Sequence, residues 1–170
     1  MGNLAVDYVG RNTIGTTTDL LETIAMKMGF VTQSVQENID LVRKAFDEGG
    51  PDTEIIFVTF SQGGQILDSL SRAFSKEECK RMTIVTFGSA KMINSEPFKR
   101  AHNYVSTRDG VPFVSDPLGH VKALLSDNVQ ITYLKTTECP ICAHRFISPV
   151  YQRALRNEGN DFLKKISEGK

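Results

Sequence analysis

The segment from Glu54 to Leu67 most constrains the fold, because an apolar run turns there into a helical pattern at a serine. Residues 55–58 are four consecutive β-branched or aromatic residues, which is typical of a central strand buried on both faces of a parallel sheet. Ser61 and two glycines follow, and apolar residues then recur at helical spacing from Ile66 to Phe74. The segment therefore predicts a strand, a sharp turn at Ser61 and a helix.

A turn of this kind has a chemical consequence. It lifts the serine hydroxyl above the sheet and points the backbone N–H of Gln62 at the place where an oxyanion would form. The glycines at 63 and 64 leave room for the close crossing of strand and helix. This arrangement is a nucleophile elbow, which makes Ser61 a candidate nucleophile and Gln62 a candidate oxyanion donor. The simpler alternative is a serine that caps a helix.

The rest of the chain alternates between strand-like and helix-like patterns. Strand patterns occur at 4–9, 82–87, 102–106 and 129–134, and helical patterns at 20–28, 34–48, 119–125 and 148–156. This alternation predicts a compact α/β fold, with a mostly parallel sheet of about five strands and helices on both faces. We expect one domain over residues 1–156, followed by a polar C-terminal tail at 157–170.

Composition excludes several classes of protein. Among 170 residues, Lys plus Arg equals Asp plus Glu at 20 each, so no charge bias points to nucleic acid or to an anionic membrane. No run of 18 apolar residues occurs, and the N-terminus lacks a signal-peptide core. Three cysteines do not make a disulfide framework. We expect a cytoplasmic protein without an integral membrane segment, with secretion by a route without a cleaved signal as the alternative.

Three polar residues follow predicted strands at their carboxyl ends, where open α/β sheets place their chemistry: Ser61, Asp109 and His144. A serine hydroxyl needs a neutral imidazole to take its proton, and the imidazole needs a carboxylate to fix its tautomer. The order serine, aspartate, histidine is the one that serine hydrolases with such an elbow use. The sequence therefore predicts a Ser61–Asp109–His144 catalytic triad.

Other residues of the same types fit these roles less well. His102 begins its strand and should lie at the opposite end of the sheet, and His120 opens a short helix, where a surface role is expected. Asp116 comes seven residues after Asp109, before a proline. The alternative for Asp109 is an ordinary turn residue beside Gly110.

Four short motifs resemble those of α/β-hydrolase lipases and esterases. The segment TFSQGG at 59–64 resembles their elbow, and TFGSA at 86–90 resembles the strand end that follows the elbow helix in class 3 lipases. DGVP at 109–112 resembles the motif that carries their acid, and HRF at 144–146 their histidine followed by an aromatic residue. The resemblance covers about residues 54–152 and implies an α/β-hydrolase-like fold. The chain is also similar in style to uncharacterised hydrolase-like proteins from chlamydiae.

The chain departs from the family pattern at two places. Thr59 stands where the usual elbow has glycine, and a β-branched residue there crowds the crossing of strand and helix. No His-Gly or Gly-Gly run marks the loop that donates the second oxyanion amide. By position, the loop after the first predicted strand must supply that amide, which makes Val9 and Gly10 the candidates.

The segment from Cys139 to Arg145 offers other chemistry. Cys139, Cys142 and His144 could be three zinc ligands, although no fourth ligand is spaced nearby. The two cysteines could also be a redox pair. The spacing of Cys139 and Arg145 matches tyrosine-phosphatase loops, but Pro140 and Ile141 stand where those loops need glycine. The simplest interpretation is two thiols in the loop that carries His144.

Together these observations predict a serine hydrolase that cleaves an ester or another acyl bond through an acyl-enzyme. The expected substrate is a small-molecule or lipid ester, and the chemistry needs no metal and no cofactor. The alternative is a catalytically silent α/β-hydrolase-like binding module that keeps the elbow as a structural feature.

Overall fold

The computed structural model describes residues 32–168 of the chain. Within them, four strands form one sheet in the order β1-β2-β3-β4, and every neighbouring pair is parallel. The strands are β1 (Ile55–Phe60), β2 (Met82–Phe87), β3 (Arg100–Ser106) and β4 (Ile131–Leu134). The predicted parallel α/β fold is confirmed, with four strands here rather than about five. The strand predicted at 4–9 and the helix at 20–28 lie outside the described residues.

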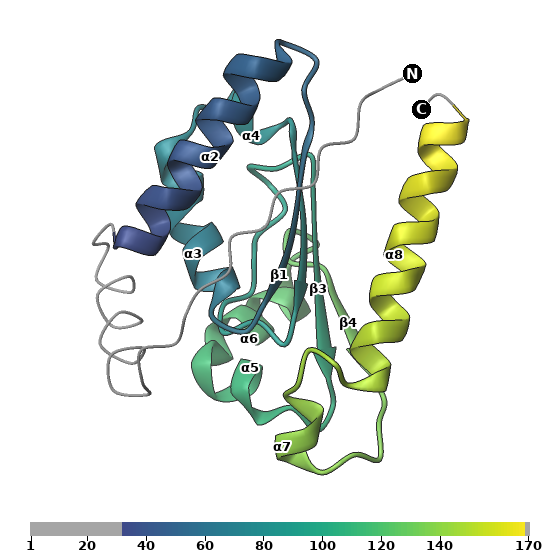
Figure 1. The fold of residues 1–170 in the computed structure, drawn as a ribbon. Helices are drawn as coiled ribbons and strands as arrows, with labels where there is room; N and C mark the ends of the chain where they lie inside the picture. The colour runs from purple at the N-terminus through teal and green to yellow at the C-terminus, as the bar shows by residue number, and fades with distance from the viewer. Residues whose placement is uncertain (1–31, 169–170) are drawn as a thin grey trace.

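Helices cover both faces of the sheet, as predicted (Figure 1). On one face lie α2 (Gln33–Gly49) and α3 (Gly63–Leu70), and on the other lies α8 (Pro149–Ser167). The remaining elements are η1 (Ser71–Ala73), α4 (Lys76–Cys79), α5 (Gly110–Ser115), α6 (Pro117–Leu125) and α7 (Pro140–Ala143). Figure 1 shows α5, α6 and α7 gathered at the carboxyl end of the strands, so these three helices belong to the connections at that end of the sheet.

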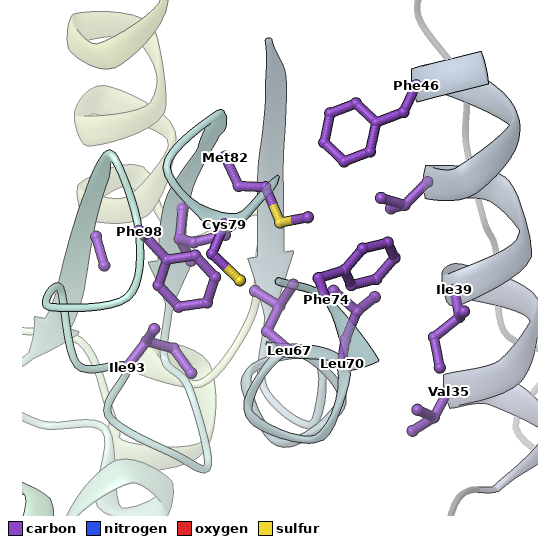
Figure 2. Packing of buried hydrophobic residues seen from close by; sticks show 13 residues of the cluster. Val35, Ile39, Phe46, Leu67, Leu70, Phe74, Cys79, Met82, Ile93 and Phe98 are labelled. Atoms are coloured by element: carbon purple, nitrogen blue, oxygen red, sulfur yellow. The ribbon is translucent and has the colours of Figure 1, made fainter. Parts of the chain in front are cut away.

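The period of two in β2 divides the core between the two faces. Met82 and Ile84 pack with α2 and α3, whereas Val85 and Phe87 pack with α8. Figure 2 shows the larger cluster, in which the apolar stripe predicted for the first described helix lies against α3 and the sheet. The buried residues of that stripe are Val35, Ile39, Val42 and Phe46. Burial on both faces explains why β2 has no exposed position.

Strand β1 differs from its prediction as a central strand buried on both faces. It lies at the end of the described sheet, and its side chains on the α2–α3 face pack into the core. On the opposite face Ile56 and Val58 keep 37% and 48% of their surface exposed. On that face the cluster around α8 includes residues of β2, β3 and β4 and the last residue of β1, Phe60, but neither Ile56 nor Val58.

The connection from β2 to β3 is irregular, so helices do not follow every strand as the alternation predicted. Residues 88–99 form turns and bends, with Met92, Ile93 and Phe98 buried. The buried side-chain amide of Asn103 forms hydrogen bonds with the backbone of this segment. Its Oδ1 accepts hydrogen bonds from Ile93 N (2.9 Å) and Thr86 Oγ1 (3.0 Å), and its Nδ2 donates to Ile93 O (3.0 Å). Side-chain hydrogen bonds thus replace the helix ladder that would satisfy this backbone.

Helix α8 is longer than predicted, because it runs to Ser167 instead of ending near Arg156. Glu158, in the segment predicted as a polar tail, binds both Nη atoms of Arg100 at 2.7 Å and accepts a hydrogen bond from Tyr104 at 2.7 Å. Burial alone would raise the pKa of Glu158, but the hydrogen bonds from Arg100 and Tyr104 outweigh it and lower the pKa. The segment predicted as a tail is therefore helical up to Ser167, and Glu158 joins its first turn to β3.

Of the helices in residues 32–168, none combines the length and the apolar character needed to cross a bilayer. The cytoplasmic location stays a prediction.

We predict that Glu158→Gln lowers the free energy of unfolding at pH 7 by about 1–3 kcal/mol, because it leaves the guanidinium of Arg100 without its carboxylate. A carboxylate whose folded pKa is lowered stabilises the fold above its ordinary pKa of 4.5, and this contribution is lost as the pH falls through the folded pKa. The difference between variant and wild type in urea unfolding should therefore shrink on acidification below pH 4.5.

The matched control is Asp161→Asn, which neutralises an exposed carboxylate on the same helix. It should change the free energy of unfolding by less than about 0.5 kcal/mol. Equal effects of the two variants would contradict the role given to Glu158.

Candidate active site

The turn between β1 and α3 has the geometry that the elbow prediction requires. Ser61 is the only residue other than glycine with a positive φ, 53°, within residues 32–168. Its N–H donates to Phe87 O at 3.1 Å, and its carbonyl accepts from Ala90 N at 2.8 Å. Positive φ in a side-chain-bearing residue is strained and is maintained only where its surroundings hold it. The end of β2 and the residues after it hold Ser61 in this conformation.

Two glycines permit the crossing, as their positions predicted. A Cβ on Gly63 would lie 2.8 Å from Thr59 Cβ, and one on Gly64 would lie 1.8 Å from Ser89 Oγ. The β-branched Thr59, which departs from the family pattern, is therefore accommodated because residue 63 has no side chain. The crossing of β1 and α3 requires the space that these glycines leave.

The structure brings Ser61, His144 and Asp109 together from three separate segments. Ser61 Oγ lies 3.0 Å from His144 Nε2, and His144 Nδ1 lies 2.8 Å from Asp109 Oδ2 and 2.9 Å from Oδ1. With Nδ1–H donating to the carboxylate, Nε2 is the acceptor that faces the serine hydroxyl. Ser61 is thus not a helix cap, since Gln62 occupies the N-cap position of α3.

Asp109 is fully buried, and it has a structural partner besides the histidine. As the N-cap of α5, its Oδ1 accepts from Val111 N at 3.0 Å. Tyr151 donates to its Oδ2 at 2.7 Å and accepts from Ser106 N at 3.0 Å. Burial, together with Asp109, raises the pKa of Tyr151, so its phenol stays protonated and donates. Asp109 therefore serves both as the helix-capping turn residue and as the partner of His144.

Gly88, at the end of β2, lies directly beneath this carboxylate. Its φ is 55°, and a Cβ there would lie 2.7 Å from Asp109 Oδ2 and 3.0 Å from Tyr151 Oη. Both the backbone conformation and the close approach favour glycine at this position. The glycine of the TFGSA segment therefore creates the space in which the buried carboxylate sits.

A ring contact on its face, in addition to the contacts of its two nitrogens, holds the imidazole of His144 in place. His144 follows α7 directly as its C-cap residue. Phe60 stacks on the ring with centroids 4.9 Å apart, and Phe60 in turn packs on Phe146 and Tyr151. The side chain of His144 is 23% exposed and that of Asp109 is buried, so solvent reaches the imidazole but not the carboxylate.

The competing residues lie elsewhere. His102, near the start of β3, binds Thr132 Oγ1 at 2.7 Å and Arg100 at 3.1 Å, and burial followed by the charge of Arg100 lowers its pKa. His120 is buried between Phe113 and Tyr133, which corrects the surface role expected for it, and burial lowers its pKa. Asp116 caps α6 and accepts from Met92 N at 2.8 Å.

The structure describes one of the residues predicted to donate to an oxyanion, Gln62. Gln62, the residue after Ser61, begins α3, so its amide lies at the positive end of that helix. The second predicted donors, Val9 and Gly10, lie outside the described residues.

Cys139 and Cys142 form a disulfide across α7, where two free thiols were the simplest expectation. Their sulfurs bind each other, and both nitrogens of His144 face Ser61 and Asp109, so these residues do not form a zinc ligand set. In residues 32–168, no three His, Cys, Asp or Glu side chains gather in a way that could hold a metal ion.

Sequence reasoning missed Tyr151 as a partner of Asp109 and Phe60 as the ring that stacks on His144. Tyr151 lies 42 residues from Asp109 in the sequence, and in the predicted helix it occupies a position expected to pack in the apolar core. Phe60 could have been suspected, because it immediately precedes Ser61 at the end of a buried strand. No local pattern singles out Tyr151.

No family model matches the chain, and no curated protein and no solved structure matches it either. The relation to α/β-hydrolases therefore stays a prediction, and any functional conclusion depends on the geometry of the site.

We predict that Tyr151→Phe lowers the free energy of unfolding by about 1–3 kcal/mol, because Asp109 Oδ2 and the Ser106 amide each lose a buried partner. Urea unfolding measures this directly. The matched control is Tyr133→Phe, which removes a hydroxyl bound to His120 from a half-exposed ring. We expect a loss below about 1 kcal/mol for the control, and a larger loss for Tyr133→Phe than for Tyr151→Phe would contradict the assignment.

We also predict that Gly63→Ala costs about 1–3 kcal/mol of stability through its clash with Thr59 Cβ. Replacing Thr59 by Gly removes that atom, so the double variant should recover at least about 1 kcal/mol relative to the sum of the two single variants. Gly159→Ala is the control, since a Cβ there meets nothing within 4 Å. In the interior of α8 it should raise stability by about 0.5–1 kcal/mol. Additive effects at 59 and 63 would contradict the proposed crossing.

Proposed function

We propose that the protein is a serine hydrolase that cleaves an ester or another acyl bond through an acyl-enzyme. The single observation that carries the proposal is the continuous hydrogen-bonded chain from Ser61 Oγ through His144 to the buried Asp109. Its three members come from the carboxyl ends of three strands, where α/β enzymes place their chemistry.

In the proposed first half-reaction, Ser61 Oγ attacks the acyl carbon while His144 Nε2 takes the hydroxyl proton. Asp109 holds the Nδ1–H tautomer and stabilises the imidazolium that forms. The Gln62 amide donates to the developing oxyanion, with the second amide predicted from the Val9–Gly10 loop. His144 then gives its proton to the leaving group as the bond between acyl carbon and leaving group breaks.

In the second half-reaction, His144 accepts a proton from water as the water attacks the acyl-enzyme. Collapse of the second tetrahedral intermediate releases the carboxylic acid, and the proton on Nε2 returns to Ser61 Oγ. The 23% exposure of the His144 side chain is consistent with access of water to this base.

The backbone of Ser61 favours the enzyme over a catalytically silent binding module. A serine that only caps a helix has extended backbone angles, whereas the φ of Ser61 is 53°. Strained positions of this kind gather at functional sites, because the fold must hold them against their cost. The expected substrate remains a small-molecule or lipid ester.

The test is the rate at which a fluorophosphonate modifies the protein, followed by intact mass. We expect one adduct on the wild type and none on Ser61→Ala. His144→Ala should lower the rate by about 10³-fold or more, since the base is lost. The matched control is His102→Ala, which removes a histidine within β3, outside the triad, and should leave the rate within about twofold.

Circular dichroism should establish that each variant is folded. The absence of an adduct on folded wild type would favour the silent binding module, and equal losses in His102→Ala and His144→Ala would contradict the triad.

A further inference from the structure

A groove of about 590 Å³ lies beside the triad, between α5 and the turn that contains α7. Its volume falls within the range of about 300–1,000 Å³ that is usual for sites of small organic ligands. The residues that line it are Gly110, Val111, Val114, Ser115, Pro140, Ile141, His144 and Arg145.

The two walls of the groove are aliphatic. Val111 and Val114 come from α5, and Pro140 and Ile141 come from α7. Val114 is 82% exposed and Ile141 is 78% exposed, so neither side chain contributes to the core. Covering exposed aliphatic surface is favourable in proportion to the area removed from water. The groove therefore favours an apolar occupant.

His144 connects the groove to the reaction. It lines the groove, and its Nε2 lies 3.0 Å from Ser61 Oγ. A ligand in the groove thus contacts the general base of the proposed mechanism. Among ester substrates, this position suits a group bonded to the carbonyl that Ser61 attacks.

The chemistry of the lining limits what that group can be. Of the described residues around the groove, Arg145 is the one with a permanent charge, and the two walls offer methyl and methylene groups. A sugar, a peptide or a headgroup would leave its polar atoms against these walls without hydrogen-bond partners, which is costly. An unbranched aliphatic chain has no such atoms.

One wall is braced covalently. The disulfide between Cys139 and Cys142 spans Pro140 and Ile141, the two residues that α7 contributes to the apolar lining. The wall is therefore held in place before a ligand arrives, which reduces the entropy lost on binding.

We propose that this groove binds an aliphatic chain of the ester substrate, with Val114 on one wall and Ile141 on the other as the residues that set the preference for chain length. This inference rests on the proposed function, because it places the acyl carbon at Ser61.

The experiment compares two fluorophosphonates that share the fluoride leaving group and differ only in their alkyl group, ethyl or decyl. Both are used below the concentration at which the decyl reagent aggregates, and the second-order rate of Ser61 modification is measured by intact mass. We expect the wild type to react roughly tenfold faster with the decyl reagent, since several methylenes leave water in an open groove. Ile141→Ser and Val114→Ser should each reduce the ratio of the decyl rate to the ethyl rate severalfold.

The matched control is Leu124→Ser, which removes an 81% exposed aliphatic side chain on α6, outside the groove. It should keep the wild-type preference. Equal rates with the two reagents would overturn this inference but not the proposed function. The same holds if Leu124→Ser loses as much of the decyl preference as Ile141→Ser, because the preference would then come from nonspecific adsorption of the decyl reagent to exposed apolar side chains. A dimer that dissociates in Ile141→Ser would overturn it as well, by showing a second copy in the groove. Failure of both reagents to modify Ser61 would overturn the proposed function and this inference together.

Discussion

The hydrogen bonds to one buried carboxylate, that of Asp109, organise the carboxyl end of the sheet. Asp109 is fully buried, and a buried carboxylate is costly unless hydrogen bonds replace its water. Its donors come from three places: Val111 in α5, Tyr151 in α8 and His144 after α7. The bonds that compensate Asp109 therefore also fix these three elements relative to the strand end and set His144 against Ser61. Structural and chemical roles of Asp109 cannot be separated, because the same oxygens serve both.

Glycines make this arrangement sterically possible. Gly63 and Gly64 let α3 approach β1 and the residues after β2, and Gly88 leaves the space that Asp109 and Tyr151 occupy. The strained Ser61 is anchored at both ends by backbone hydrogen bonds to Phe87 and Ala90. Hydrogen bonds across the β1–β2 boundary thus hold a conformation that local preferences disfavour. Beside this polar centre, the exposed aliphatic residues of α5 and α7 form the groove, so an apolar surface lies next to His144 and the hydroxyl of Ser61.

Much of this could be predicted where the signal was local. The apolar runs placed the start of β1 and both bounds of β2, and the stripe from Val35 to Phe46 placed α2. Ser61, Asp109 and His144 were found because each comes after a predicted strand, and parallel strands bring their carboxyl ends to one edge. Predictions of which side chains are buried were less accurate. One face of β1 is half-exposed although burial on both faces was expected, and His120 is buried although a surface position at a helix start was expected.

The sequence by itself determined the four described strands, the longer helices α2, α3, α6 and α8, the sharp turn at Ser61 and the convergence of three polar residues on one rim, because these follow from period, turn chemistry and parallel pairing. Only the tertiary structure decided that Tyr151 supports Asp109, that Glu158 extends the packed part of α8 to Arg100, and that Cys139 and Cys142 are joined beside the groove. The first two contacts join residues 42 and 58 positions apart. No local pattern encodes such pairs, since they exist only when α8 packs on the sheet.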